Sequence, residues 1–546
     1  MRISFPLKKE FIFVFLIIIA GFIIRWNNIE KIPYGIEGDE INWITNSLFY
    51  QYNILGAERG NWSQNDALAQ IYPVSIKINQ LSFILFGKDY YSPKKMLVFI
   101  SIFSLFFFYI LSRKFLSVKA SLITLLLFSF ATYKLVTSRI AFPHVYSELF
   151  VYPAIILILN IVPRQLLKNS IYSFSAGLLL TLSLLTYNLA FLLPVTCFLI
   201  LIVQIVKKHI TWINALLILF MFLFALFLTS KLWLKSLRSE ISMRGAMLDN
   251  SSFSIKSNNF SLGKLRENLY SVADQLFYSL KYNTADMLVS YPKPLINNLI
   301  SGAFIIGFIL AVFRIKKYLP IIIWFLSSGF IYQVILRFQL PRMWFLTMGV
   351  LYLLAGLFIN LLLQIIKKTL HKLNLDSDNT KKWRFIHFFI YTTVTVLIVI
   401  PVIYIITSDI KLFYTQAINN PSYKISYRES IDVVKKYKKN LRRNVIFVSD
   451  TEVEAARINP IISFYYLVEH PDQAEILKNL SRQEIGSFTE EEFKKKYSLY
   501  LNRLNIIITN ELSFKTVKSL VQQKGQCQYY TNRHKYYSEL TPFDCR

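Results

Sequence analysis

The sequence predicts a mainly α-helical membrane protein, a polytopic bundle of about eleven transmembrane helices followed by a small C-terminal α/β domain. Apolar runs of 16–24 residues recur along most of the first 410 residues, and runs of this length can span a bilayer. Only 17% of the residues are charged, whereas soluble domains usually approach a quarter. From about residue 408 the composition turns polar, which predicts a separate folded domain there.

The first apolar run, 11–24, follows two lysines and is followed by Arg25 and Trp26. These flanking residues suit the two membrane interfaces. No small-residue cleavage site follows, so we expect a retained helix rather than a signal peptide. Further runs predict the other spans, at 96–111, 119–136, 145–162, 171–187, 189–206, 211–230, 297–313, 319–336, 343–366 and 385–407.

Basic residues in the short connections predict the orientation of the bundle. By the positive-inside rule, Lys8 and Lys9 place the N-terminus in the cytoplasm. Residues 1–407 are therefore expected to form a multi-pass domain of the cell membrane, and residues 408–546 an extracytoplasmic domain. The same orientation puts these basic connections on the cytoplasmic side: Arg113/Lys114, Arg164/Lys168, Lys207/Lys208, Arg314/Lys316/Lys317 and 367–384.

Two long loops are expected outside, at 25–95 and 231–296. The first contains amphipathic pieces such as 68–86, which predict helices along the membrane surface. The net charge of +29 follows from the basic connections. No basic and aromatic platform accompanies it, so we expect no nucleic-acid partner.

The C-terminal part alternates between helical and strand patterns. Residues 426–440 predict an amphipathic helix, 444–449 and 504–509 predict strands, and 512–523 predict a second helix. No glycine-rich phosphate loop follows either strand. Cys527 and Cys545 lie near the C-terminus, and outside the cytoplasm they could form a disulfide or remain two free thiols.

The segment YGIEGDEINW, at 34–43, places Glu37, Asp39 and Glu40 directly after the first helix. One interpretation is a solvated helix start, because acidic residues stabilise helix N-termini. The other is a carboxylate pair at the membrane surface, where partial desolvation raises a carboxyl pKa and makes a general base.

Further polar residues fall at the outer ends of the expected spans. Short outer loops should be poor in arginine, so the arginines found there indicate a functional role rather than a topological one. Arginine binds phosphate in bidentate fashion, which suits a substrate with a phosphate leaving group. The candidates are Arg139, His144 and Glu148, then Tyr187 and Asn188, then Arg238 and Arg244, then Arg337 and Arg342.

Structural interpretations of these residues stay open. Arg139 could anchor a helix at the interface, and Glu148 could form an ion pair with it. His144 could be an ordinary interfacial histidine, and Tyr187 could belong to an aromatic belt. A membrane transporter of a lipid-linked or anionic substrate is the main alternative to an enzyme, and an assembly scaffold is a third class. Transporters, however, usually carry repeats and mid-membrane charges, which the sequence lacks.

Five segments follow one another in order along residues 1–366. They read GIEGDEINWITNSLFYQYNILG, IYPVSIKINQLSFILFGKDYYSPKKMLVFIS, TSRIAFPHVYSELFVYPAI, LSLLTYNLAFLLPV and LRFQLPRMWFLTMGVLYLLAGL. Together they resemble glycosyltransferase family 39 of the C superfamily (GT-C) of membrane glycosyltransferases, which includes protein O-mannosyltransferases and aminoarabinose transferases that modify lipid A. In that order they resemble the family's Asp-Glu first loop, its Pro-containing helix with a following FG, its Ser-Arg turn, its Tyr-to-Pro segment and its late Arg-and-Pro turn.

The resemblance implies a sugar donor carried on a polyprenyl phosphate and transfer with inversion to a protein, lipid or glycan acceptor. Asp39 matches the family's base, and Glu40 would orient the acceptor or an arginine. The donor phosphate would bind the arginines, with Arg139 in the Ser-Arg turn. Arg337 and Arg342 are looser matches, and Arg238 and Arg244 lie where the family has a variable loop near the donor. The substrate would contact Glu37, His144, Glu148, Tyr187 and Asn188.

Two departures concern the sugar and the acceptor. Relatives commonly have an aspartate near the position of His144, and an arginine where this chain has Phe191. No cofactor is required by the pattern, although part of the superfamily binds a divalent cation, which Asp39 would then hold. No cluster in the sequence has clear metal-ligand spacing.

Overall fold

The computed structural model describes residues 8–30, 38–52, 72–187, 191–234, 262–278, 295–335, 344–375, 381–419, 428–437, 439, 445–449, 452–474, 487–500, 506–524, 527–533 and 537–545. The chain divides into two compact units. The first is Met1–Pro33, Ile71–Ser75 and Lys94–Ser422, and the second is Tyr34–Gln70, Ile76–Pro93 and Tyr423–Arg546. This division differs from the predicted boundary at 407, because most of the first outer loop belongs with the C-terminal part.

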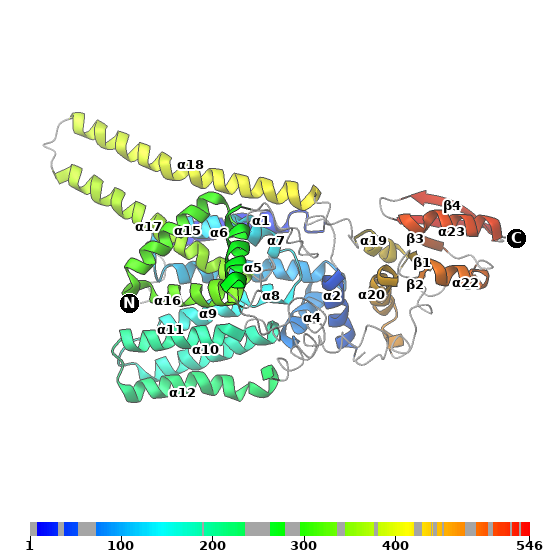
Figure 1. Ribbon diagram of the computed structural model, residues 1–546, viewed down its shortest axis with the longest axis horizontal. Helices are drawn as coiled ribbons and strands as arrows, with labels where there is room; N and C mark the ends of the chain where they lie inside the picture. The colour runs from blue at the N-terminus through cyan, green and yellow to red at the C-terminus, as the bar shows by residue number, and fades with distance from the viewer. Residues whose placement is uncertain are drawn as a thin grey trace. The chain divides into compact units, whose positions relative to one another are not determined.

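The first unit is helical (Figure 1). Four helices in the described part of the chain are long and apolar enough to cross a membrane: Ser92–Ser112, Leu166–Thr186, Thr347–Lys368 and Ile398–Thr415. The prediction of a membrane helical bundle agrees with this, while the number of eleven spans stays a prediction. The helices of the first unit are α1 (Lys8–Trp26), α5 (Ser92–Ser112), α6 (Val118–Phe130), α7 (Thr132–Thr137), α8 (Pro143–Tyr146), α9 (Glu148–Leu159), α10 (Leu166–Thr186), α11 (Leu192–Lys207), α12 (Trp212–Leu228), α14 (Leu262–Ala273), η3 (Asp274–Tyr278), α15 (Asn298–Phe313), α16 (Ile315–Phe325), η4 (Leu326–Ile335), α17 (Phe345–Leu375) and α18 (Lys381–Asn419).

Helix α12 shows how the apolar helices pack. It runs beside α10 and α11 in Figure 1. Phe222 and Ala225 are buried toward its neighbours, whereas Phe220 and Phe227 are exposed. Such an apolar exposed face suits a lipid environment, because lipid chains solvate large apolar side chains without the free-energy cost of exposing them to water.

Two of the expected continuous spans are divided. The run 119–136 forms α6 and α7, because Ala131 between them has an extended backbone with φ −53° and ψ 129°. The run 145–162 begins as the short helix α8 and continues as α9. Thr132, at the start of α7, donates a hydrogen bond of 3.1 Å to the Asp409 carboxylate of α18. The division at Ala131 therefore leaves α7 as a separate short helix with polar contacts of its own.

The second unit joins most of the long loop predicted at 25–95 to the C-terminal part. Its loop helices are α2 (Gly38–Gln51) and most of α4 (Pro73–Phe86), and amide side chains of α4 bond to α2. Asn79 donates to the Ser47 hydroxyl at 2.9 Å, and Gln80 donates to the Ser47 carbonyl at 3.1 Å. Helices were expected at both places: α4 lies within the predicted segment 68–86, and α2 begins in the acidic segment 34–43.

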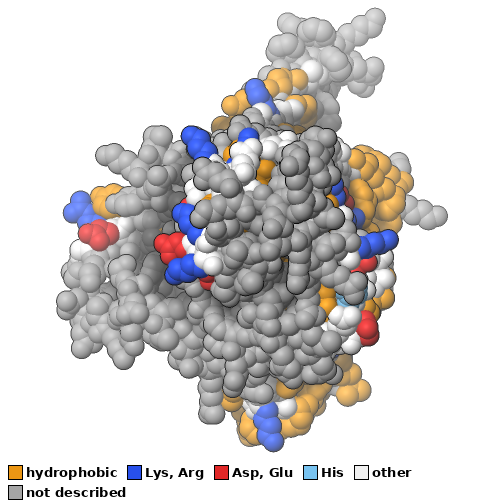
Figure 2. All heavy atoms as spheres, turned by 90° about the vertical axis from the view of Figure 1, so that its right-hand side faces the viewer, with side chains coloured by type: hydrophobic (Ala, Val, Ile, Leu, Met, Phe, Trp, Pro, Cys, Tyr) orange, Lys and Arg blue, Asp and Glu red, His pale blue; other side chains and the backbone are white. Residues whose placement is uncertain are grey.

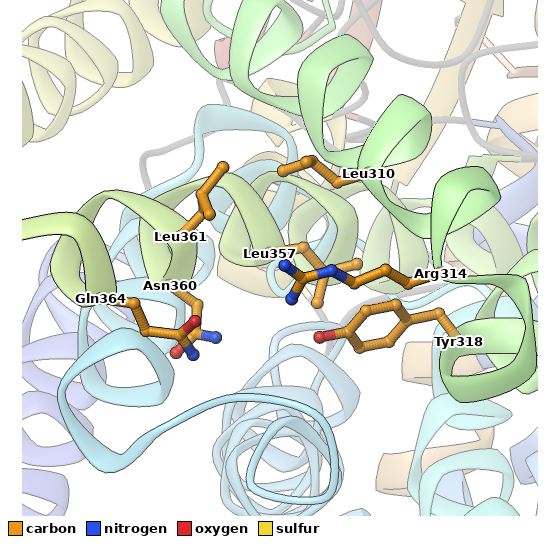
Figure 3. A pocket seen from close by; sticks show the side chains of 7 residues that line it. All are labelled: Leu310, Arg314, Tyr318, Leu357, Asn360, Leu361 and Gln364. Atoms are coloured by element: carbon orange, nitrogen blue, oxygen red, sulfur yellow. The ribbon is translucent and has the colours of Figure 1, made fainter. Parts of the chain in front are cut away.

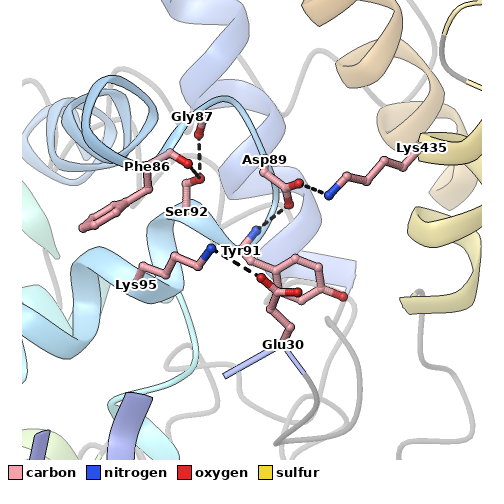
Figure 4. A network of polar contacts seen from close by, with 8 residues as sticks. All are labelled: Glu30, Phe86, Gly87, Asp89, Tyr91, Ser92, Lys95 and Lys435. Atoms are coloured by element: carbon pink, nitrogen blue, oxygen red, sulfur yellow. Dashed lines mark hydrogen bonds and ion pairs between the residues drawn. The ribbon is translucent and has the colours of Figure 1, made fainter. Parts of the chain in front are cut away.

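The turn after α4 connects this loop to the C-terminal helices α19 (Arg428–Lys436) and α20 (Glu452–Glu469). The Tyr90 ring packs on Phe464 at 4.4 Å, and its hydroxyl bonds to the Thr45 hydroxyl of α2 at 2.7 Å. Burial raises the pKa of Tyr90, so the hydroxyl stays protonated. Asp89 forms an ion pair with Lys435 of α19 (Figure 4).

The C-terminal residues form a five-stranded mixed sheet with strand order β2-β1-β3-β5-β4. The first three strands are parallel, and β5 runs antiparallel to β3 and β4. Strands β1 and β3 lie where the sequence predicted them. The elements are β1 (Val445–Ser449), β2 (Ser487–Thr489), α22 (Glu490–Tyr500), β3 (Ile506–Asn510), α23 (Glu511–Lys524), β4 (Cys527–Arg533) and β5 (Tyr537–Cys545). Its apolar core includes Val448, Phe488, Ile507 and Phe514.

Figure 2 shows one face of the molecule by side-chain type. The described lysine and arginine side chains of this face lie among aspartate and glutamate side chains and do not form one continuous patch.

The backbone register places Cys527 opposite Cys545 in strands β4 and β5. Directly opposite residues of antiparallel strands have Cα atoms about 4.5–5.5 Å apart, a separation that disulfides span. We therefore expect a disulfide in the oxidised protein. Peptide mass spectrometry without reduction should find the two peptides linked, with two hydrogens fewer than the reduced pair. The buried free cysteine Cys197 serves as the internal control, since it should be alkylated only after denaturation. Two separately alkylated peptides from Cys527 and Cys545 would contradict the prediction.

Candidate functional site

Four buried charged residues of the first unit lie in or near the short helix α7. Arg25 lies at the C-terminal end of α1, Lys134 lies in α7, Arg139 follows α7, and Glu148 begins α9. All four side chains are buried. Arg25 lies within electrostatic reach of both Arg139 and Glu148, and Lys134 within reach of Arg25. Sequence analysis had identified Arg139 and Glu148 as candidate functional residues, but not Arg25 or Lys134.

Glu148 forms an ion pair with Lys134. The side chains are 4% and 0% exposed, respectively, so water screens this pair very little. Glu148 is the first residue of α9, where the positive end of the helix dipole also favours a carboxylate. Sequence analysis had suggested Arg139 as its partner. The structure instead gives it Lys134 and the first position of the helix.

The two arginines hold the end of α1. Arg139 donates from Nη2 to the backbone oxygens of Ile24 and, at 2.5 Å, Asn27. Arg25 donates to the oxygen of Gly21 at 3.0 Å and to that of Ser129 at 2.6 Å. The last carbonyls of a helix lack partners within the helix, and cations near them are stabilising. Arg139 therefore acts at least as a cap of α1, in line with the anchor interpretation.

The cluster carries more positive than negative charge. Arg25, Lys134 and Arg139 supply three cations, and the described carboxylates beside α7 are Glu148 and Asp409. Buried charges are costly unless they are compensated, because the protein interior solvates them poorly. The arrangement can therefore stabilise an additional negative charge, such as that of a phosphate group.

Tyr187 directly follows α10 and belongs to a buried aromatic group. Its ring stacks on Tyr72 at 5.4 Å and meets Phe345, at the start of α17, edge-on at 5.9 Å. The preceding residue, Thr186, shares a hydrogen bond of 2.8 Å with the Ser147 hydroxyl. The structure thus brings the end of α10, which carries Tyr187, to the start of α9, which carries Glu148.

In the second unit, the acidic pair lies in the first turn of α2. The helix begins at Gly38, so Asp39 and Glu40 are its second and third residues. The structure describes the backbone of Asp39. Glu40 lies at a helix start, as one interpretation had it, but it is only 2% exposed and therefore not solvated. The contacts of α2 with α20 and of Thr45 with Tyr90 fix the helix that carries both acids.

The remaining candidates fall outside the described residues or side chains. His144 lies in α8, whose backbone alone is described at that position. Those outside the described residues are Glu37, Asn188, Arg238, Arg244, Arg337 and Arg342. Among the described side chains, no group of three or more histidine, cysteine, aspartate or glutamate residues could hold a metal ion.

Comparison of the fold with solved structures gives near-full-length matches. The crystal structure of ArnT from Cupriavidus metallidurans bound to undecaprenyl phosphate matches with a TM-score of 0.53 and 12% identity, over 96% of this chain and 97% of that one. The archaeal oligosaccharyltransferase AglB from Archaeoglobus fulgidus, in complex with an inhibitory peptide and a dolichol-phosphate, matches with a TM-score of 0.50 and 11% identity, over 98% of this chain and 74% of that one. No protein-family profile and no curated protein matches the sequence. The chain thus has a fold similar to that of these two proteins, as the resemblance predicted.

Proposed function

We propose that this protein is an integral membrane glycosyltransferase that moves a sugar from a polyprenyl phosphate to an acceptor outside the cytoplasm. The observation that carries the proposal is a likeness, over nearly the whole of this chain, to two proteins whose structures hold undecaprenyl phosphate and dolichol-phosphate. Fold alone does not fix an activity. The buried excess of cations around α7 supports it independently, because a lipid phosphate would supply the compensating negative charge.

In the proposed reaction Asp39 is the general base. It removes the proton from the acceptor hydroxyl, whose oxygen forms a bond to the anomeric carbon of the sugar. The bond between that carbon and the phosphate oxygen breaks in the same displacement, so the anomeric configuration inverts. The polyprenyl phosphate leaves with the electron pair. Positive charge stabilises this leaving group, and Arg139, Arg238, Arg244, Arg337 and Arg342 are the proposed ligands.

The other proposed roles follow the same reaction. Glu40 orients the acceptor or an arginine, and Glu37, His144, Tyr187 and Asn188 bind substrate. Glu148 is a further proposed substrate-binding residue, and Arg139 also holds the end of α1. The proposed orientation has a cytoplasmic N-terminus and an outer C-terminal sheet. A divalent cation at Asp39 remains part of the proposal as an option, which chelation before the assay would test.

The test is sugar transfer by the protein in lipid nanodiscs, with a panel of radiolabelled polyprenyl-phosphate sugars and a cell-envelope acceptor fraction. Loss of a general base typically slows a reaction at least about 100-fold, so Asp39→Asn should lose transfer by that factor. The exposed Asp472 supplies the control, since Asp472→Asn makes the same change in the C-terminal part. Equal transfer by wild type and Asp39→Asn would refute Asp39 as the base. Absence of transfer with every donor would favour the transporter.

A further inference from the structure

A pocket lies between α15, α16 and α17 in the first unit (Figure 3). Its apolar wall is formed by Leu310, Leu357 and Leu361, and its polar groups come from four other side chains. These are Arg314, Tyr318, Asn360 and Gln364, and Figure 3 shows the Arg314 guanidinium and the Tyr318 hydroxyl directed into the space between them.

The pocket is remote from the site described above. Helix α17 begins with Phe345, which packs on Tyr187, and Asn360 follows 15 residues later along the same helix. At a rise of 1.5 Å per residue this places Asn360 roughly 22 Å from the aromatic group. A ligand of this pocket would therefore be distinct from the donor and the acceptor in the proposed reaction.

The chemistry of the pocket is that of an anion site. Within the described residues, the Arg314 guanidinium has no carboxylate or carbonyl partner. Asn360 is buried, and its oxygen accepts from the backbone nitrogen of Ser117 at 3.1 Å, which fixes its amide in place. A guanidinium beside amide and phenol donors matches the acceptor oxygens of a phosphate group.

The surroundings favour a lipid as the source of that phosphate. Phe313, next to Arg314, is 83% exposed, and Ile309 one turn earlier is also exposed. Large apolar side chains on the surface of a membrane helix contact acyl chains. A lipid whose phosphate reached Arg314 could lay its chain along this face of α15.

We propose that the pocket of Arg314, Tyr318, Asn360 and Gln364 binds the phosphate headgroup of an anionic phospholipid. Arg314 supplies the charge, and the amides of Asn360 and Gln364 and the Tyr318 hydroxyl donate hydrogen bonds to phosphate or glycerol oxygens. The leucine wall and the exposed face of α15 hold the first methylene groups of the acyl chain. The proposal needs neither the sugar-transfer activity nor the orientation of the bundle.

Native mass spectrometry of the detergent-solubilised protein tests this, with phosphatidylglycerol, phosphatidylcholine and inorganic phosphate as probes. Wild type should bind phosphatidylglycerol in preference to phosphatidylcholine. Loss of a charged hydrogen-bond donor should weaken phosphatidylglycerol binding about tenfold in Arg314→Gln. Lys316→Gln removes the same charge two residues away, from an exposed side chain outside the pocket, and should change the affinity less than about twofold.

Two further results would decide the proposal. Gln364→Leu changes an exposed pocket position, where misfolding is not expected, and should also weaken phosphatidylglycerol binding. The affinity of this variant is compared with that of the Lys316→Gln control. Equal affinity of wild type and Arg314→Gln, or equal losses in Arg314→Gln and Lys316→Gln, would overturn the site. Competition by millimolar inorganic phosphate as effective as that by the lipid would overturn the lipid assignment and leave a free-anion site.

Discussion

Glu148→Gln should lower the free energy of unfolding by about 3–5 kcal/mol, the usual cost of removing one partner of a buried ion pair. The carboxylate of Glu148 is the ion-pair partner of Lys134, and both side chains are almost wholly buried. Without it the Lys134 ammonium would remain in a low-dielectric region beside Arg25, which adds repulsion. Titration with sodium dodecyl sulfate in mixed micelles would measure the loss.

The double variant Lys134→Met/Glu148→Met separates the ion pair from packing. Replacing both partners by apolar side chains removes the stranded charge, so much of the lost stability should return. A matched surface control is Glu490→Gln, which breaks the partly exposed pair of Glu490 and Lys494 and should cost less than about 1 kcal/mol. A double variant as unstable as the sum of its single variants would rule out the ion pair as the cause.

Hydropathy predicted the helices of the first unit well, because a membrane span is encoded by local composition alone. It failed where one backbone dihedral decides the structure. Residues 119–136 form one hydropathic run across Ala131, so mean hydropathy alone does not separate α6 from α7. The signal that could have been used was Lys134 itself, because a lone lysine in an apolar run needs a buried partner.

The association of the first outer loop with the C-terminal part could not be predicted in this way. Tyr90 and Pro460 are 370 positions apart, and the Tyr90 hydroxyl lies 3.3 Å from the Pro460 oxygen. Each segment looks like an ordinary amphipathic or buried piece by itself. The sequence could identify the acidic pair Asp39 and Glu40. Only the folded unit shows that α2, which carries the pair, packs on α20.

Gly307→Ala should destabilise the contact between α15 and α17 strongly, although it adds only one methyl group. A Cβ atom at this position would lie 1.8 Å from the Leu354 oxygen and 2.6 Å from the Leu354 carbon. Both are backbone atoms of a helix, so no rotamer change can relieve the overlap and the helices must separate. Overpacking of this kind typically costs about 1–3 kcal/mol, and the backbone clash should place this variant at or above the upper end.

Gly302→Ala is the matched control, because it makes the same change on the same helix where no heavy atom lies within 4 Å. Alanine favours helix over glycine by about 1 kcal/mol, so this variant should be as stable as wild type or slightly more so. Unfolding in mixed micelles and the yield of monodisperse protein would compare the two. Equal stability of both variants would mean that α15 and α17 do not approach closely at Gly307. Leu310 and Leu357 lie one helical turn beyond Gly307 and Leu354. Separation of α15 from α17 in Gly307→Ala should therefore also weaken phosphatidylglycerol binding at Arg314.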